Sequence, residues 1–126
     1  MWACSGFTFG DGSNDNRIDW DFNDDIHIRF SVASGGTTVT TMQQSNVPDI
    51  NDEFRIAAAV KLNDQIGVVN GTAISSADTS CAQPVDMDRL YLGLRGNEGN
   101  QGALTIKRFM FYPKRLPDSQ LVTLTS

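Results

Sequence analysis

The sequence predicts an all-β fold, a sandwich or jelly roll of antiparallel strands. Alternating apolar and polar residues recur along the chain, and this period of two places the apolar side chains on one face of a strand. Asp, Asn, Ser and Gly, which favour turns over helix interiors, make up 43 of the 126 residues. Because no linker or repeat divides the chain, we expect residues 1–126 to form a single domain of some eight strands.

The first predicted hairpin joins strands at residues 17–22 and 26–32 through an Asn/Asp turn. Both segments alternate cleanly, which places their apolar side chains in the core. We expect their polar side chains to lie on a solvated face, with Asp19 and Asp21 beside arginines. A Thr-rich strand over residues 37–43 follows. The expected core residues of the hairpin are Ile18, Trp20, Phe22, Ile26, Ile28, Phe30 and Val32.

A second predicted hairpin joins strands at residues 54–62 and 65–69 through the Asn63-Asp64 turn. Asn70-Gly71 then predicts another tight turn, because both turn positions need a positive φ, and residues 72–74 return as a strand. The first of these strands has small apolar residues on its second face, so we expect it to be covered on both sides. Its expected inward residues are Phe54, Ile56, Ala58, Val60 and Leu62.

The C-terminal third begins with a polar connection over residues 75–87. Residues 89–95 alternate and predict a strand with its leucines inward, and residues 104–112 predict a long final strand that ends at a proline. One helical turn is expected over residues 116–121, with a proline at an early position. The leucines expected inward are Leu90, Leu92 and Leu94.

Several segments carry a family resemblance through their order and spacing. They are residues 54–57 (FRIA), 61–64 (KLND), 69–71 (VNG), 89–93 (RLYLG) and 106–116 (IKRFMFYPKRL). With these segments the chain, from about Phe9 to Leu124, resembles the concanavalin A-like lectin/glucanase (laminin G-like) jelly rolls of bacteriophage tail and head appendages.

The resemblance implies an extracellular virion domain that binds a carbohydrate or host-surface receptor without catalysis, beside other virion proteins. Domains of this kind usually carry more strands before the point where this chain begins. The chain is then a reduced sandwich, a fragment truncated at its N-terminus, or a domain whose missing edge a neighbouring subunit supplies. Because an unpaired sheet edge is an association hazard, we expect a homo-oligomer. The alternative function is a structural capsid-decoration or tail-fibre module that acts in virion assembly without a glycan ligand.

Composition argues against two classes of partner. A net charge of −5 and a pI near 4.6 disfavour nucleic-acid binding, which depends on Lys and Arg at phosphates. The longest apolar run, residues 56–60, is far shorter than the roughly 20 residues of a membrane helix. The N-terminal residues show no secretory signal pattern.

We expect no enzymatic activity. Glycanases of this fold class use a Glu-x-Asp-x-x-Glu strand, with the two carboxyls about 5 Å apart in retaining enzymes. Here Glu53 and Glu98 lie in separate loops, and Asp19 and Asp21 are interpreted as part of a solvated strand face. His27, the single histidine, is expected at the surface, and without a Gly-x-Ser-x-Gly elbow it supports neither a nucleophilic triad nor a zinc site.

The candidate ligand-binding surface is the strand face opposite the leucines of residues 89–95, together with the Gly-rich loop that follows. An aromatic side chain and planar polar groups on one face can bind sugar hydroxyls, whereas Trp20 is expected in the core. The alternative is an ordinary amphipathic strand. The candidate residues are Tyr91, Arg89, Arg95, Asn97, Asn100 and Arg29, with His27 beside them.

Two further groups are candidates for a metal site and a disulfide. Asp11, Ser13 and Asp15 occupy positions 1, 3 and 5 of a calcium-loop pattern that lacks its Gly at position 6 and its Glu at position 12. An Asx-rich turn is therefore favoured over calcium of another geometry, and no other cofactor is expected. Cys4 and Cys81 form a disulfide if the first strand passes residues 78–83, or else remain two free thiols.

Overall fold

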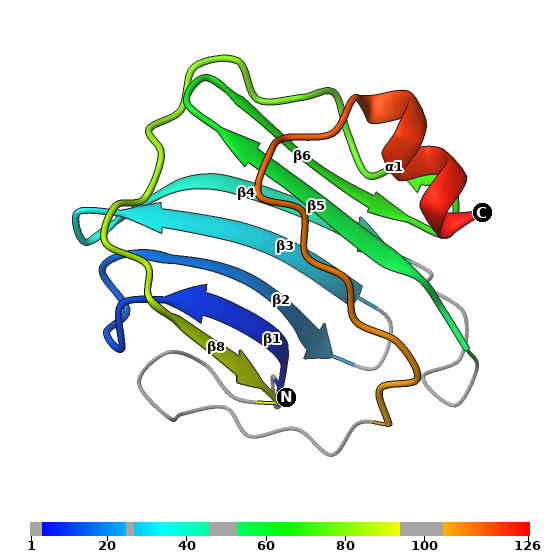
Figure 1. Cartoon of the computed structure of the whole chain (residues 1–126), viewed down its shortest axis with the longest axis horizontal. Coiled ribbons are helices and arrows are strands. Elements are labelled where there is room, and N and C mark those ends of the chain that lie inside the picture. The colour runs from blue at the N-terminus through cyan, green and yellow to red at the C-terminus, as the bar shows by residue number, and fades with distance from the viewer. Residues whose placement is uncertain (1–3, 25–26, 46–52, 94–104) are drawn as a thin grey trace.

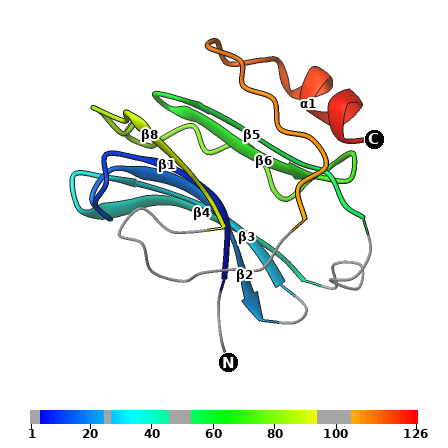
Figure 2. The same ribbon diagram turned by 60° about the horizontal axis from the view of Figure 1, so that its bottom comes forward.

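The computed structural model describes residues 4–24, 27–45, 53–93 and 105–126. Two antiparallel sheets face each other across an apolar core, and a C-terminal helix lies on the far side of the smaller sheet (Figures 1 and 2). The predicted all-β sandwich is therefore confirmed. Within these ranges, no helix has the length and hydropathy that a membrane crossing requires.

The strands of the described residues form a five-stranded sheet in the order β4-β3-β2-β1-β8 and a three-stranded sheet in the order β5-β6-β7. The larger sheet contains β1 (Cys4–Gly10), β2 (Arg17–Asp24), β3 (His27–Ser34), β4 (Thr37–Ser45) and β8 (Arg89–Leu92). The smaller sheet contains β5 (Ile56–Lys61), β6 (Asp64–Val69) and β7 (Thr72–Ala73). The predicted hairpin of β2 and β3 is confirmed, and it pairs Trp20 with Phe30.

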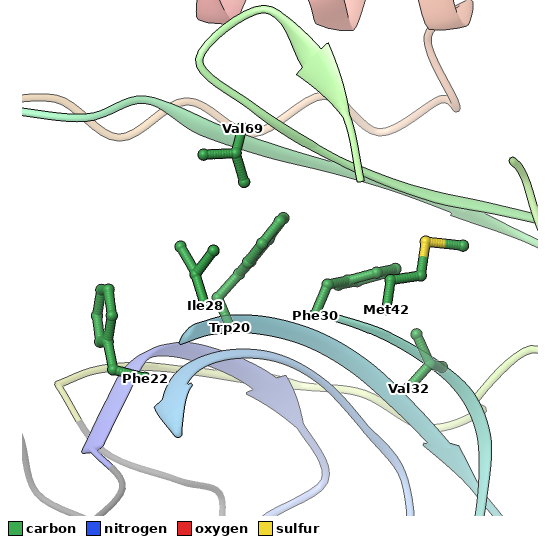
Figure 3. Close-up of a cluster of buried hydrophobic side chains, with 7 residues drawn as sticks. All are labelled: Trp20, Phe22, Ile28, Phe30, Val32, Met42 and Val69. Atoms are coloured by element: carbon green, nitrogen blue, oxygen red, sulfur yellow. The ribbon is translucent and has the colours of Figure 1, made fainter. Parts of the chain in front are cut away.

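The main core lies between the two sheets (Figure 3). The Trp20 and Phe30 rings lie 5.3 Å apart at its centre, and Val69 of β6 reaches toward them from the facing sheet. The alternating residues of β5 pack against this cluster as predicted, except Leu62, which follows the end of β5 and is 58% exposed. The buried cluster is Trp20, Phe22, Ile28, Phe30, Val32, Met42 and Val69.

A second, smaller core lies between the three-stranded sheet and the helix α1 (Asp118–Thr125). Ala57 and Ala59 of β5 point to this side, and their small side chains let Leu121 of the helix pack closely. The prediction that this strand is covered on both faces is therefore confirmed. The predicted helical turn is also confirmed, with Pro117 at its N-cap, although α1 continues for eight residues.

Two tight turns join the strands of the smaller sheet. The Asn70-Gly71 turn forms as predicted, whereas the first turn lies at Leu62-Asn63, one residue before the predicted position, and Asp64 begins β6. Asn63 and Asn70 both have a positive φ, of 54° and 47°, and Gly71 has a φ of 77°. The Asn70 side-chain oxygen accepts a hydrogen bond from the Arg55 backbone N–H at 2.8 Å, and the Gly71 N–H donates to the Thr125 hydroxyl at 3.0 Å. The last turn of α1 is thereby connected to the hairpin.

One prediction for the C-terminal third is wrong, and another is only partly correct, because Leu90 and Leu92 point to the core side without being buried. Strand β8 is only four residues long, and Leu90 and Leu92 are 40% and 48% exposed because the three-stranded sheet does not reach over this edge; Leu94 lies outside the described residues. The predicted final strand is absent from residues 105–112. Instead, ion pairs from Lys107 to Glu53 and from Arg115 to Asp64 hold this part of the chain along β5 (Figure 1).

Aromatic contacts explain where that segment lies. Phe109 meets the Phe7 ring edge-on, with centroids 5.9 Å apart, and Phe111 stacks on Phe9 at 5.3 Å. Phe7 and Phe9 belong to β1, which the smaller sheet leaves without an opposing strand. The segment therefore covers the part of the core that a longer second sheet would otherwise cover.

Gly67 of β6 should tolerate no larger side chain, because a Cβ there would lie 3.1 Å from atoms of both Trp20 and Phe30. Gly67→Ala should lower the free energy of unfolding by about 1–3 kcal/mol through overpacking. Urea unfolding followed by circular dichroism measures the change. The control is Gln43→Ala on the exposed side of β4, which should stay within about 0.5 kcal/mol of the wild type. An unchanged Gly67→Ala variant would show that the two sheets are not in close contact here.

Candidate functional site

The face of the five-stranded sheet that points away from the core is the candidate site, and we call it the outer face. It carries the polar half of each alternating strand. Strand register places five of these residues in one row across the sheet. From β8 to β4 they are Tyr91, Thr8, Asp19, Ser31 and Thr41.

Two carboxylates lie at the centre of the outer face, and both are fully buried. Asp21 accepts two hydrogen bonds from Arg29, from Nε at 3.0 Å and from Nη2 at 2.6 Å. Asp19 accepts one from Arg17 Nε at 3.0 Å and another from the Ser31 hydroxyl. The prediction of a solvated face is therefore wrong for these two carboxylates, although their arginine neighbours were expected. The long arginine side chains cover the shorter aspartates.

The two ion pairs hold their arginines in fixed orientations. A guanidinium that donates two parallel hydrogen bonds to one carboxylate, as Arg29 does to Asp21, cannot rotate freely. The hydrogen bond to Asp21 raises the pKa of Arg29, so the guanidinium stays positively charged. Both arginines stay partly exposed while the aspartates are not. In these two ion pairs, only the arginine side chains therefore reach solvent.

Tyr91 and Arg89 of β8 extend the site to the sheet edge. Both point to the outer face, where Tyr91 is half-buried opposite Thr8. A hydrogen bond to Tyr91, and then the charge of Asp88, raise the pKa of Arg89. The Arg89 guanidinium lies directly against Gly12, whose φ of 88° and lack of a side chain permit this close approach.

The candidate site has two parts: Tyr91 and Arg89 on β8, and the arginine–aspartate pairs on β2 and β3. Small residues of β1 lie between these two parts. Gly10 stands between Arg89 of β8 and Arg17 of β2, as Thr8 does between Tyr91 and Asp19. The structure therefore brings Tyr91 and Arg89 together as predicted, and adds Arg17, which sequence reasoning missed. The signal for Arg17 was its position two residues before Asp19 on one strand, since residues i and i+2 share a face.

The remaining predicted residues do not lie beside Tyr91 and Arg89 in the described structure. Arg29 shares the outer face but lies on β3, with two strands between it and β8. Arg95, Asn97 and Asn100 lie outside the described residues, so their part in the site stays a prediction. His27 begins β3, is half-buried, and pairs in the sheet with Ser45.

The Asp11 loop is built as an Asx turn. Asp11 Oδ1 accepts hydrogen bonds from the Ser13 N–H at 2.8 Å and the Ser13 hydroxyl at 2.6 Å, and Oδ2 accepts one from Asn16 at 3.1 Å. The Ser13 oxygen also accepts a bond from the Asp15 N–H at 3.0 Å. These bonds occupy the oxygens of the calcium-loop pattern. Among the residues that the structure describes, no three His, Cys, Asp or Glu side chains are grouped to hold a metal ion.

Cys81 is a buried free thiol in this structure, which corresponds to the free-thiol alternative for this residue. The Cys81 Sγ donates to the Asp78 carbonyl at 3.2 Å, and burial raises the pKa of the thiol. The physical reason is the path of the chain. Cys4 pairs with Phe22 in the larger sheet, whereas backbone bonds connect residues 78–81 to Asn63 and Gln65 of the smaller one.

Comparison with known proteins bears on the fold alone. No family model matches the sequence, and no curated protein matches it. The fold is similar to the crystal structure of an S-layer domain-containing protein (residues 221–444) from Clostridium thermocellum, with a TM-score of 0.54 and 16% sequence identity. The match covers 95% of this chain and 61% of the other, so this chain spans about three fifths of that structure.

Arg29→Met should lower the free energy of unfolding by about 3 kcal/mol, because the buried Asp21 carboxylate would lose its cation. Urea denaturation at pH 7 measures the loss. The matched control is Lys107→Met, whose pair with Glu53 is 71% and 54% exposed; it should lose less than about 1 kcal/mol. Adding Asp21→Leu to Arg29→Met should recover part of the loss. Equal losses in the two single variants would contradict the buried pairing.

Asp11 should titrate far below an ordinary aspartate. Hydrogen bonds from Ser13 and then Asn16 lower its pKa from 3.8 to about 2, since they favour the charged carboxylate. Their contribution to stability is complete above the unfolded-state pKa and disappears as the pH falls through the folded-state value. Carbon-13 NMR of the carboxyl group should give a midpoint near 2. Ser13→Ala should raise the midpoint, and a wild-type midpoint at the ordinary value would contradict the Asx turn.

Proposed function

We propose that the chain is a non-catalytic binding domain of a bacteriophage virion appendage, and that its outer face binds a carbohydrate or another host-surface receptor. One observation carries this proposal. The outer face holds Arg17, Arg29, Arg89 and Tyr91 as oriented donors and an aromatic ring, with two carboxylates fully buried beneath two of the arginines.

The chemistry of these side chains suits a hydroxyl-rich ligand. A guanidinium presents five N–H donors in a plane, and Arg29 uses two of them for Asp21, which leaves others for ligand oxygens. Tyr91 adds an apolar ring with a polar end, the combination that packs on a sugar ring and bonds its hydroxyls. Because Arg29 and Arg17 are already fixed by their aspartates, binding would immobilise little additional side-chain freedom.

The charge of the outer face also favours a neutral ligand. Arg17 and Arg29 each neutralise one aspartate, and Arg89 lies 3.3 Å from Asp88. A polyanion such as nucleic acid would need unneutralised cations, which these pairs do not supply, and the whole chain carries a net charge of −5.

The carboxylates support binding over hydrolysis. A glycanase acid must keep its proton near neutral pH, which requires a raised pKa. A hydrogen bond from Lys107 lowers the pKa of Glu53 instead, and Glu98 lies outside the described residues. Asp19 and Asp21 are covered by arginines. The virion context and extracellular location come from the family resemblance of the chain from about Phe9 to Leu124, as do other virion proteins as partners.

A second candidate function is a structural decoration or fibre module that acts in virion assembly without a glycan. Exposed apolar side chains along β8 and residues 105–112 favour it, because soluble monomers rarely leave such residues contiguous. They are Leu90, Leu92, Ile106, Phe109, Met110, Phe111 and Tyr112.

Glycan binding should depend on Tyr91. A glycan array would identify a ligand, and Tyr91→Ala should then weaken its binding at least about ten-fold, as loss of an aromatic anchor does. Tyr112→Ala, which removes the other tyrosine from an exposed position off the outer face, is the matched control and should bind normally. Thermal unfolding would verify that both variants are folded. Failure of the wild type to bind any glycan, with stable incorporation into a virion, would support the assembly module instead.

A further inference from the structure

Among the described residues, strand β8 forms one edge of the five-stranded sheet, and its core side is apolar and only partly covered, with Leu90 40% and Leu92 48% exposed. Leu90 and Leu92 lie beside Phe9 and Phe7 of β1 on that side, and the three-stranded sheet does not extend over them. An edge strand with apolar residues is a template for pairing with another chain.

The phase of the backbone hydrogen bonds shows which groups face the edge. The Gly93 N–H donates to the Gly6 carbonyl at 2.8 Å, so in this antiparallel pair residues 91 and 93 direct their backbone groups toward β1. At the start of β8 the Asp88 N–H donates to the Gly10 carbonyl at 3.0 Å, so the alternation is irregular there. Leu90 and Leu92 direct theirs the opposite way, away from β1. The same two residues thus present both their side chains and their backbone N–H and C=O groups at the edge of the molecule.

We propose that two copies of this chain pair through β8, antiparallel, about a two-fold axis at Tyr91. In this register Leu90 of each copy lies opposite Leu92 of the other. Each such pair exchanges two backbone hydrogen bonds, so the junction gains four. The four leucines meet on the core side of the joined sheets. The two Tyr91 rings meet on the outer face, and Arg89 lies opposite Gly93 rather than opposite another cation.

Neighbouring registers fit less well. An axis between Leu90 and Tyr91 would oppose residues that point to different faces, which an antiparallel pair does not allow. An axis at Leu90 would oppose Leu92 with Asp88, and a carboxylate would then lie against the apolar strip. Within Arg89–Leu92, the Tyr91 axis sets Leu90 against Leu92 and opposes no two like charges, so these four residues are complementary to themselves there.

The pairing is independent of ligand binding but changes its geometry. The two five-stranded sheets would form one continuous sheet, and their outer faces would share one side of the dimer. Two ligand sites would then be adjacent across the axis. A receptor with repeated sugars could occupy both, and linkage of two weak sites raises overall affinity without new contacts.

The mass of the native protein in solution tests the pairing. Analytical ultracentrifugation at up to about 0.1 mM should show a dimer of the wild type. Leu90→Glu/Leu92→Glu should be monomeric, because four carboxylates would meet at the axis. Leu62→Glu, at a leucine that is 58% exposed beyond the end of β5, should remain a dimer. A monomeric wild type, or a double variant that stays dimeric, would overturn the proposal.

Cysteine cross-linking tests the register. Residues on the axis have Cβ atoms about 4.5–5.5 Å apart, close to disulfide geometry, so Tyr91→Cys should form a covalent dimer under oxidation. Arg89→Cys, opposite Gly93, should not, and the wild type shows any contribution of Cys4 and Cys81. Cross-linking through position 89 and not 91 would overturn this register. Glycan binding by Leu90→Glu/Leu92→Glu, whose outer face is intact, reports on the proposed function separately.

Discussion

The Trp20 and Phe30 rings contact the facing sheet at Gly67, and this contact determines how the rest of the structure is arranged. Both rings project from neighbouring strands into the core, and a strand alternates its side chains between two faces. Once Trp20 faces inward, Asp19 and Asp21 must face outward, and a slip of one residue would exchange the two sets. The apolar contact on one side of the sheet thereby determines which charges form the outer face.

Local sequence signals predicted the hairpins well, because their information lies within a few residues. Asn70-Gly71 needs only its own positive φ values, and the alternation of residues 17–22 specifies its two faces. The burial of Asp21 could not be predicted from the local sequence. It depends on Arg29, eight residues away on another strand, whose side chain must cross the pair and cover the carboxylate.

The C-terminal third shows a different limit of prediction from the sequence. Leu90 and Leu92 alternate like core residues, and in the sheet they do point to the core side. Alternation identifies a face but does not say whether a second layer reaches over it, and among the residues that the structure describes that layer is three strands wide. The candidate site was also predicted only in part, because the pairing between strands cannot be read from a single strand. Tyr91 and Arg89 could be placed together from one strand, whereas Arg17 joined them only through the pairing of β1 with its two neighbours.

The bond between Gly71 and Thr125 has a practical consequence for handling this protein. It fixes the end of α1 against the Asn70-Gly71 turn, on the side of the smaller sheet that faces away from the larger one (Figure 2). The C-terminus and the outer face therefore point in opposite directions. A tag or solid support attached after Ser126 would therefore lie away from the arginines and Tyr91, and immobilisation through that end would leave the proposed binding face clear of the support.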